Sequence, residues 1–336
     1  MINQFFHNCK LFKLLLFVVS LPFYTRKNEK VTAKSKIICI FAENYCLMRY
    51  RIAIIIAAIL LSSVTYAQRK RAFLVGISNY DTALTGYQWN NINGVEDVNL
   101  LGPILKKQGF SFISLVDEQA TYTNITNGLT KFINKTKKGD IVYLHFSAHG
   151  QPVEDLDGDE EDGWDESIVP IDAYKIYKKG VYEGEKHLLD DQLNKYIKRL
   201  REKIGVKGFL YVVIDACYAG TSSRTNDDNV RGTKVGFSYS NKVFKPTRTK
   251  KSHYVIESSA AMCNVMYLEA CRPDQINTEI RIGNKRFGPL SYNIAQALSA
   301  CTLTTDANVF LKHIQNSLMQ NGRWPNNQNL VTETSF

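Results

Sequence analysis

Two continuous apolar runs constrain the fold of this 336-residue chain more than any other feature. Residues 140–147 read DIVYLHFS and residues 208–216 read GFLYVVIDA, and their central residues lack the alternation of apolar and polar side chains that a half-exposed strand shows. Strands buried on both faces have this pattern, and they are typical of parallel sheets that helices cover on both sides. A glycine follows shortly after the end of each run, at Gly150 in SAHG and at Gly220 in ACYAG. We therefore expect two central strands with polar groups at their carboxyl ends.

The segments around these runs alternate between strand-like and helix-like patterns. Apolar and β-branched runs predict strands at residues 71–77, 111–116, 140–147, 208–216 and 253–260. Apolar residues at helical spacing predict helices at residues 95–108, 123–137, 190–203, 290–300 and 306–321. This alternation predicts an α/β fold, with a mostly parallel sheet flanked by helices on both faces. In such sheets ligands bind beyond the carboxyl ends of the strands.

The N-terminal segment has the composition of a secretory leader. Residues 48–67 contain two arginines, an apolar run and a small-residue cleavage site, so we expect a signal peptide there. Residues 1–47 place another basic and apolar segment before it. We interpret them as an upstream extension from a wrongly assigned start codon, and the alternative is a genuine membrane-associated extension. The mature chain, residues 68–336, is then exported to the periplasm or out of the cell, and only an uncleaved leader would contact a membrane.

The formal net charge of +10 does not indicate nucleic-acid binding. Residues 1–67 contain nine Lys or Arg and two Glu, a balance of +7. Residues 68–336 contain 33 basic and 30 acidic residues, a balance of only +3. The mature chain therefore lacks the basic, aromatic-studded surface that nucleic-acid binding requires, and we expect no nucleic-acid partner.

A histidine and a cysteine follow the two central strands. His149 lies in SAHG and Cys217 in DACYAG, far apart in sequence but expected at the same edge of the sheet. A thiolate nucleophile needs a base that accepts its proton and N–H donors that stabilise the developing oxyanion. His149 can be this base, and the N–H groups of Gly150 and Cys217 can be these donors. The pattern predicts a cysteine peptidase whose chemistry requires no cofactor.

A series of motifs resembles the metacaspases, the caspase-like cysteine peptidases of clan CD and peptidase family C14. The motifs are RAFLVGISNY, NGVEDVNLL, FSAHG, DLDGDEEDGWDESIVPID, LLDDQLNK, VVIDACYAG and VIESSA, in this order from about Arg71 onward. The resemblance implies that residues 68–336 are a caspase-like peptidase domain, with His149 as general base and Cys217 as nucleophile. The chain departs from the common family pattern at Ala148 and in the YAG that follows the cysteine, but neither change touches the catalytic pair.

An acid near the cysteine indicates where the substrate is cut. Asp215 lies two residues before Cys217 on the same side of the strand, and a carboxylate there suits Arg or Lys at P1, the residue before the cleaved bond. By the resemblance, Asp97, Ser147 and Asp215 line S1, the pocket for this residue. We therefore expect protein or peptide substrates with a basic P1 residue, not Asp. The alternatives are a first-turn helix acid for Asp97 and a structural hydrogen-bond acceptor for Asp215.

Residues 154–166 are dense in carboxylates, but they are not an EF-hand, because Glu160 stands where the loop needs glycine. In calcium-dependent metacaspases an Asp after this segment and a paired Asp-Asp bind the ion. The resemblance assigns these ligands to Asp172, Asp190 and Asp191, and it implies Ca²⁺ as an activator. The alternatives are a solvated acidic loop and a pair of acids that cap the helix they begin.

Residues 221–251 occupy the place of a loop that caspase-like enzymes often cleave. The basic residues considered in it are Arg224, Arg231, Lys234 and Lys242. Self-processing after one of them is a hypothesis, beside a plain solvated loop. For the whole chain, the alternative is a catalytically silent caspase-like binding module. An α/β hydrolase or a nucleotide-binding protein is excluded, because G-x-S-x-G, P-loop and G-x-G-x-x-G motifs do not occur.

Overall fold

A computed structural model describes residues 44–45, 47–54, 68–80, 89–158, 160, 162–218, 229–233, 235–242, 244–245, 256–321 and 323–335. The chain divides into two compact units, Met1–Tyr66 and Ala67–Phe336. In the first unit the described residues 47–54 are helical. Among the helices in the described ranges, none is long and apolar enough to cross a membrane.

The second unit is built on a six-stranded sheet with the strand order β11-β8-β7-β3-β1-β2. The strands are β1 (Lys70–Gly76), β2 (Phe110–Val116), β3 (Ile141–Ser147), β7 (Phe209–Asp215), β8 (Asn264–Glu269) and β11 (Val331–Ser335). Five of them are parallel, and β11 pairs antiparallel with β8 at one edge. This sheet confirms the predicted α/β class.

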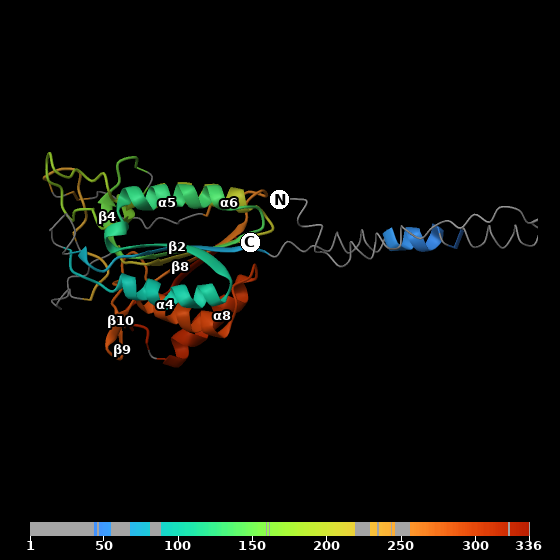
Figure 1. Ribbon diagram of the computed structural model, residues 1–336. Helices are drawn as coiled ribbons and strands as arrows, with labels where there is room; N and C mark the ends of the chain where they lie inside the picture. The colour runs from blue at the N-terminus through green and yellow to red at the C-terminus, as the bar shows by residue number, and fades with distance from the viewer. Residues whose placement is uncertain are drawn as a thin grey trace, which may run out of the picture. The chain divides into compact units, whose positions relative to one another are not determined.

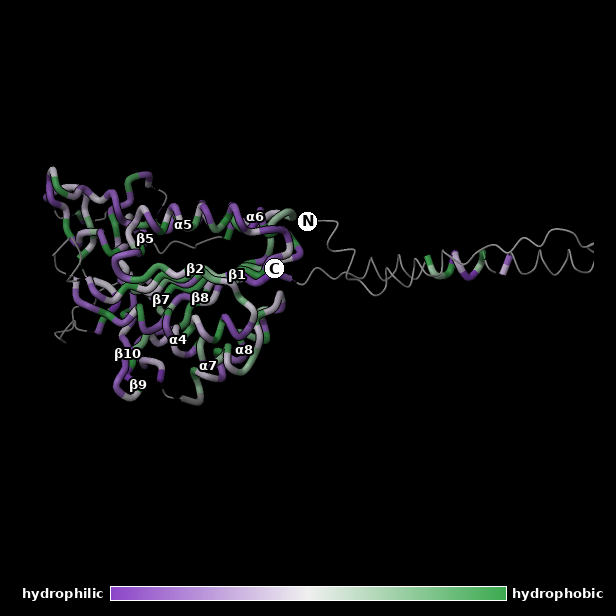
Figure 2. The backbone as a smooth tube through the Cα atoms, viewed as in Figure 1, coloured by the Kyte–Doolittle hydropathy of each residue, from purple (hydrophilic) through white to green (hydrophobic). Residues whose placement is uncertain are grey.

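Helices cover both faces of the sheet (Figure 1). One layer consists of α5 (Tyr122–Lys135) and α6 (Asp190–Ile204), and the other of α4 (Gly94–Lys107), α7 (Pro289–Ala300) and α8 (Ala307–Asn321). In α5 the apolar residues at helical spacing are buried and the opposite face is polar. Figure 2 shows the resulting change between hydrophilic and hydrophobic residues along this helix. All five predicted helices occur within two residues of their predicted ends.

The two continuous apolar runs are β3 and β7, and every residue of both strands is buried. The strands are neighbours in register, so that Ser147 at the end of β3 pairs with Asp215 at the end of β7. The segments that follow them therefore leave the sheet at the same edge, where ligand sites of such sheets lie.

The predicted strand at residues 253–260 is wrong. Residues 256–260 are not in a strand and are mostly exposed, and residues 253–255 lie outside the described ranges. The fifth parallel strand is β8, in which residues 265–268 are buried beside β7. A strand covered on both faces needs consecutive apolar residues; NVMYLE supplies four, whereas VIESSA is interrupted by Glu and Ser.

Two smaller sheets lie outside the main sheet. β4 (His149–Glu154), β5 (Trp164–Val169) and β6 (Leu188–Leu189) form an antiparallel sheet, and β9 (Ile280–Ile282) pairs with β10 (Lys285–Phe287) in a hairpin. The sequence pattern predicts none of these strands. Figure 1 shows β4, β9 and β10 at the same end of the main sheet. They surround the edge at which the predicted site lies.

Candidate active site

Three residues from separate elements form a buried polar pocket at this edge. Asp97 lies in the first turn of α4, Ser147 ends β3 and Asp215 ends β7, and all three are fully buried. The Ser147 hydroxyl donates a hydrogen bond to Asp97 Oδ2 over 2.7 Å. The structure thus brings together the three residues that the sequence predicts for S1.

The side chain of Arg231 fills this pocket and is itself fully buried. Its Nη1 lies 2.8 Å from Asp97 Oδ2 and 3.7 Å from Asp215 Oδ1, and it donates a hydrogen bond to the Ser147 hydroxyl over 2.5 Å. Burial alone would lower the pKa of the guanidinium, but the surrounding carboxylates raise it. A charged basic side chain of the same chain therefore occupies the predicted S1 pocket.

Glu279 completes the pocket, and no pattern in the sequence predicts it. Its Oε1 lies 2.8 Å from Nη2 and 3.2 Å from Nε of Arg231. Asn93 holds the Glu279 carboxylate in place, because its backbone N–H donates to Oε1 and its side-chain amide donates to Oε2. Glu279 is distant in sequence from the motifs around His149 and Cys217, and only the folded chain brings it to them.

Asp215 is held in place by three donors. Asn277 Nδ2 donates to its Oδ1 over 2.7 Å, while the backbone N–H and the hydroxyl of Ser291 donate to Oδ2 over 2.7 and 2.6 Å. The Ser291 hydroxyl also lies 3.1 Å from Nε2 of His145. Burial lowers the pKa of His145 to about 4, so this ring is neutral near pH 7 and supports Asp215 as a structural group.

The pocket holds more negative than positive charge. The three carboxylates of Asp97, Asp215 and Glu279 surround the one guanidinium of Arg231. Burial raises the pKa of Asp97 to about 7, and Asp215 adds to the rise, whereas Arg231 opposes it. A buried excess of carboxylate favours a bound cation, or a bound proton when the pH falls.

The backbone of Arg231 lies against the other predicted residues. Its carbonyl oxygen accepts hydrogen bonds from the N–H groups of Gly150 and Cys217, both over 3.0 Å. These are the two donors that the sequence predicts for an oxyanion. A Cβ added to Gly150 would lie 2.5 Å from the Cys217 carbonyl oxygen, and one added to Gly232 would lie 2.2 Å from it. Both positions therefore require glycine for this close approach.

His149 begins β4 and is 2% exposed. Its Nε2 lies 2.7 Å from the carbonyl oxygen of Asn90, and because a carbonyl only accepts, Nε2 carries the proton. The unprotonated Nδ1 has no hydrogen-bond partner within the described ranges. Trp89 stacks on the ring with 4.9 Å between centroids, and burial lowers the pKa of His149 to about 3. His149 is thus a neutral imidazole whose Nδ1 lone pair is available to accept a proton.

Cys217 is fully buried. Its Sγ donates a hydrogen bond to the carbonyl oxygen of Gln275 over 3.1 Å, and the Sγ of Cys271 lies 3.6 Å from the same oxygen. A hydrogen bond with Cys217 and burial raise the pKa of Cys271, so the second sulfur stays a protonated thiol. Neither cysteine forms a disulfide.

The region that builds this site matches a known family. The model of the metacaspase, peptidase C14 domain, matches residues 70–225, a range that includes His149 and Cys217. Residues 70–225 are thus similar to the peptidase domain of metacaspases. Metacaspase-1 of Plasmodium falciparum is 29% identical over 227 residues, which are 64% of this chain and 32% of that protein. Metacaspase-1B of Aspergillus fumigatus is 34% identical over 166 residues, 46% of this chain and 36% of that protein.

The chain spans about a third of the length of these relatives. Metacaspase-2 of Arabidopsis thaliana is covered to a similar extent, 35%, with 33% identity over 165 residues. Among solved structures, a crystal structure of a protein from Geobacter sulfurreducens has the same fold. The TM-score is 0.54 at 19% identity, over 80% of this chain and 93% of that one.

The structure does not gather the three predicted calcium ligands into one group. Asp172 accepts the N–H of Tyr122 and pairs with Lys186 at 3.4 Å. Asp191 is 40% exposed and points away from its neighbour Asp190, since successive residues of a helix lie on different sides. The resemblance gives the spacing of these acids along the chain but not the directions of their side chains.

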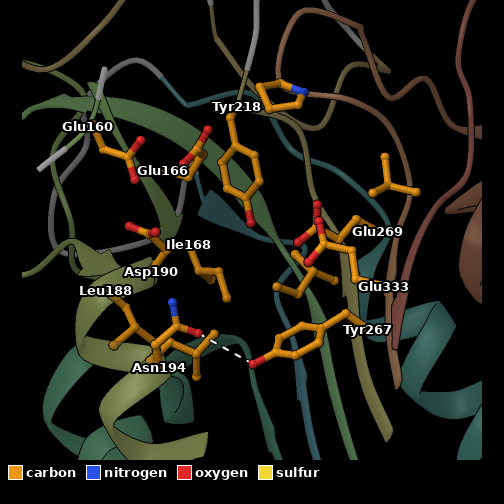
Figure 3. A pocket seen from close by; sticks show the side chains of 14 residues that line it. Glu160, Glu166, Ile168, Leu188, Asp190, Asn194, Tyr218, Tyr267, Glu269 and Glu333 are labelled. Atoms are coloured by element: carbon orange, nitrogen blue, oxygen red, sulfur yellow. Dashed lines mark hydrogen bonds between the residues drawn. The ribbon is translucent and has the colours of Figure 1, made fainter. Parts of the chain in front are cut away.

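Asp190 belongs instead to another group of carboxylates. One oxygen each of Glu160, Glu166 and Asp190 lies within 4.8 Å of the others, a spacing that suits the oxygen ligands of a hard cation. The three acids line a cavity of about 270 Å³ together with Tyr218 and Glu269 (Figure 3). Burial raises the pKa of Glu166 well above its ordinary value, and Asp190 and Glu160 add to the rise.

Proposed function

We propose that this chain is a cysteine endopeptidase that cleaves peptide bonds after Arg or Lys. The position of Arg231 carries the proposal. Its guanidinium lies among the pocket carboxylates, while its carbonyl oxygen accepts two hydrogen bonds from Gly150 and Cys217. A substrate is bound in the same two-part way, with its P1 side chain in S1 and its carbonyl oxygen in the oxyanion hole. The metacaspase peptidase domain supports the same class of reaction.

In the proposed reaction Cys217 is the nucleophile and His149 is the general base. Nδ1 of His149 accepts the thiol proton, and the thiolate attacks the P1 carbonyl carbon to give a tetrahedral intermediate. The N–H groups of Gly150 and Cys217 stabilise its oxyanion. The imidazolium then gives its proton to the departing amine, and a thioester remains. Water hydrolyses the thioester with His149 again as base, which restores the thiol without any cofactor.

The charges of the pocket support a basic P1 residue. Asp97, Asp215 and Glu279 offer buried carboxylates to a cation, and Arg and Lys are the side chains that satisfy them. A P1 Asp would add a fourth carboxylate to a site that already lacks positive charge. We therefore propose that the enzyme rejects P1 Asp.

We also propose that the enzyme cuts itself at the Arg231–Gly232 bond. Gly232 lies next to Gly150 in a parallel bridge, so the chain on both sides of this bond is aligned along the site. Of the other basic residues considered, Lys242 is exposed, and two lie outside the described ranges. Because Arg231 occupies S1, the uncut chain excludes other substrates from its own site.

Calcium activation is a further part of the proposal. Glu160, Glu166 and Asp190 would hold the ion, with water completing the six to eight oxygen ligands that Ca²⁺ takes. Tyr218, which follows the nucleophile directly, lines the same cavity. A cation there would therefore act beside Cys217, and it would remove the mutual repulsion of the three carboxylates.

The test follows the full-length chain and its Cys217→Ala variant by intact-mass spectrometry, first in millimolar Ca²⁺ and then in chelator. We expect fragments that end at Arg231 and begin at Gly232, from the unsubstituted chain alone. Fluorogenic peptides ending in Arg, Lys or Asp then report on added substrates. The absence of Cys217-dependent cleavage in every condition would favour the silent binding module. Release only after Asp would contradict the proposed role of Asp215.

A further inference from the structure

We infer that Glu279 makes the S1 pocket select arginine over lysine at P1. The inference rests on the proposed function and refines it. Asp97, Ser147 and Asp215 account for a preference for positive charge, but they do not distinguish the two basic side chains. The distinction lies in the contacts of the Arg231 guanidinium, because opposite sides of the pocket contact different nitrogens of this group.

The two sides of the pocket contact different nitrogens. Asp97 and Ser147 contact Nη1, at 2.8 and 2.5 Å. Glu279 contacts the other edge, with its Oε1 at 2.8 Å from Nη2 and 3.2 Å from Nε. In a guanidinium these nitrogens stand apart in a rigid planar fork, whereas lysine presents one compact ammonium. A single ammonium cannot occupy both positions, so a lysine leaves the carboxylate on one side without a cation in contact.

Glu279 is oriented before a substrate arrives. The backbone N–H and the side-chain amide of Asn93 hold its two oxygens at 2.6 and 2.5 Å, and only 5% of the residue is exposed. A carboxylate fixed in this way cannot turn to follow an ammonium toward Asp97. Selectivity is a difference between two affinities, and a buried carboxylate that lysine leaves uncompensated lowers the affinity for lysine.

The backbone sets the register between P1 and Glu279. Residues 229–231 lie antiparallel beside residues 277–279. The N–H of Arg231 donates to a carbonyl of the second segment over 3.0 Å, and the N–H of Glu279 donates to a carbonyl of the first over 2.8 Å. A substrate strand that makes the same hydrogen bonds places its P1 side chain beside Glu279 whatever its other residues are.

The kinetic experiment compares the full chain with its Glu279→Gln and Glu96→Gln variants. Glu96 is the matched control, because it adjoins Asp97 in α4 and carries the same charge, but its carboxylate pairs with Lys285 at the surface. Each protein is processed to completion, with tagged unsubstituted enzyme added and then removed where self-processing is slow. Values of kcat/KM are then measured for two peptides that differ only in P1 Arg or P1 Lys.

For Glu279→Gln we expect kcat/KM to fall about 10- to 100-fold with the Arg peptide, which corresponds to the loss of hydrogen bonds to a charged group. With the Lys peptide kcat/KM should fall less than about 3-fold. Glu96→Gln should change neither by more than about 2-fold. An equal loss with both peptides would overturn the inference, because Glu279 would then act as a general anion. An unchanged Arg-to-Lys ratio would overturn it as well.

A second measurement does not depend on activity. In the Cys217→Ala chain, which stays uncut, Arg231→Lys should lower Tm by about 4 °C or more. When Glu279→Gln is already present, adding Arg231→Lys should lower Tm by less than half as much. Equal shifts in both backgrounds would overturn the inference. If the unsubstituted enzyme releases neither peptide, the proposed function fails, while this cycle still decides whether Glu279 distinguishes a guanidinium from an ammonium.

Discussion

Replacing Arg231 by Gln tests the charge balance of the pocket most directly. The substitution removes the cation that contacts Asp97, Asp215 and Glu279 and leaves three carboxylates buried. Removing one partner of a buried ion pair costs about 3–5 kcal/mol, a large part of the roughly 5–15 kcal/mol that stabilises a typical domain. We expect a loss of this size in the free energy of unfolding at pH 8, measured in the Cys217→Ala background so that no chain is cut.

The loss should shrink as the pH falls. Burial raises the pKa of Asp97 to about 7 even though Arg231 opposes the rise, so the substitution raises this pKa further. Between about 7, the pKa of Asp97 in the unsubstituted chain, and the higher value in the variant, Asp97 binds a proton in the folded variant but not in the folded unsubstituted chain. The variant therefore gains stability relative to the unsubstituted chain as the pH falls through this window. At pH 5 we expect the substitution to lower the free energy of unfolding by less than half as much as at pH 8.

Urea unfolding followed by tryptophan fluorescence measures both values. Lys242→Gln is the control, because it removes an exposed positive charge from the same segment and should change the stability by less than about 0.5 kcal/mol. A loss below about 1 kcal/mol at pH 8 would refute the reasoning, since water would then reach the carboxylates as soon as the cation is gone. An equal loss at pH 5 and pH 8 would refute the role of Asp97 as the proton acceptor.

Other perturbations separate the remaining parts of the site. His149→Ala should slow self-cutting by about 10²- to 10⁴-fold in a mass-spectrometric time course, and an unchanged rate would exclude it as the base. For Arg peptides kcat/KM should rise with pH through a midpoint above 7 as Asp97 loses its proton, because the emptied pocket no longer contains Arg231, which lowers this pKa. Glu279→Gln should move this midpoint to lower pH, whereas a flat pH profile would contradict the charge argument. Glu166→Gln should raise the Ca²⁺ concentration for half-maximal activity about tenfold or more, unless the ion binds elsewhere. Protein recovered after export should begin at Gln68 by N-terminal sequencing, and another first residue would contradict the predicted signal peptide.

The sequence predicts an element well where its pattern is long and local. β3 and β7 occur within one residue of their predicted ends, because a run of seven mostly apolar residues is typical of a strand buried on both faces. The β8 strand has a weaker pattern, since its four buried residues are flanked by polar ones and a second apolar run precedes it. The sequence pattern does not predict the small sheet of β4, β5 and β6, for a different reason. Its strands β4 and β5 pair across an acidic segment, and the sequence shows no periodic pattern that predicts this pairing.

The residues of the candidate site also fall into two groups, those at strand ends that the sequence predicts and those in irregular segments that it does not. Ser147, Asp215 and Cys217 stand at or beside strand ends, so the register of β3 and β7 alone brings them together. Glu279 and Arg231 lie in segments without periodicity, and they meet only because residues 229–231 pair with residues 277–279. No local pattern contains that information. The predicted Ca²⁺ ligands show the converse, because matching acids in sequence did not give side chains that converge.

Cutting the Arg231–Gly232 bond does not by itself empty the pocket. After the cut, Arg231 is still joined to Cys217 through residues 218–230. Such a short tether keeps the new terminal arginine at an effective concentration on the order of millimolar, against which any added substrate must compete. Residues 218–230 contain one basic residue, Arg224. A cut after Arg224 frees residues 225–231 as a peptide, and only then does Arg231 leave S1 by simple dilution. If the chain processes itself as proposed, we therefore expect full activity only after two cuts, one after Arg231 and one after Arg224.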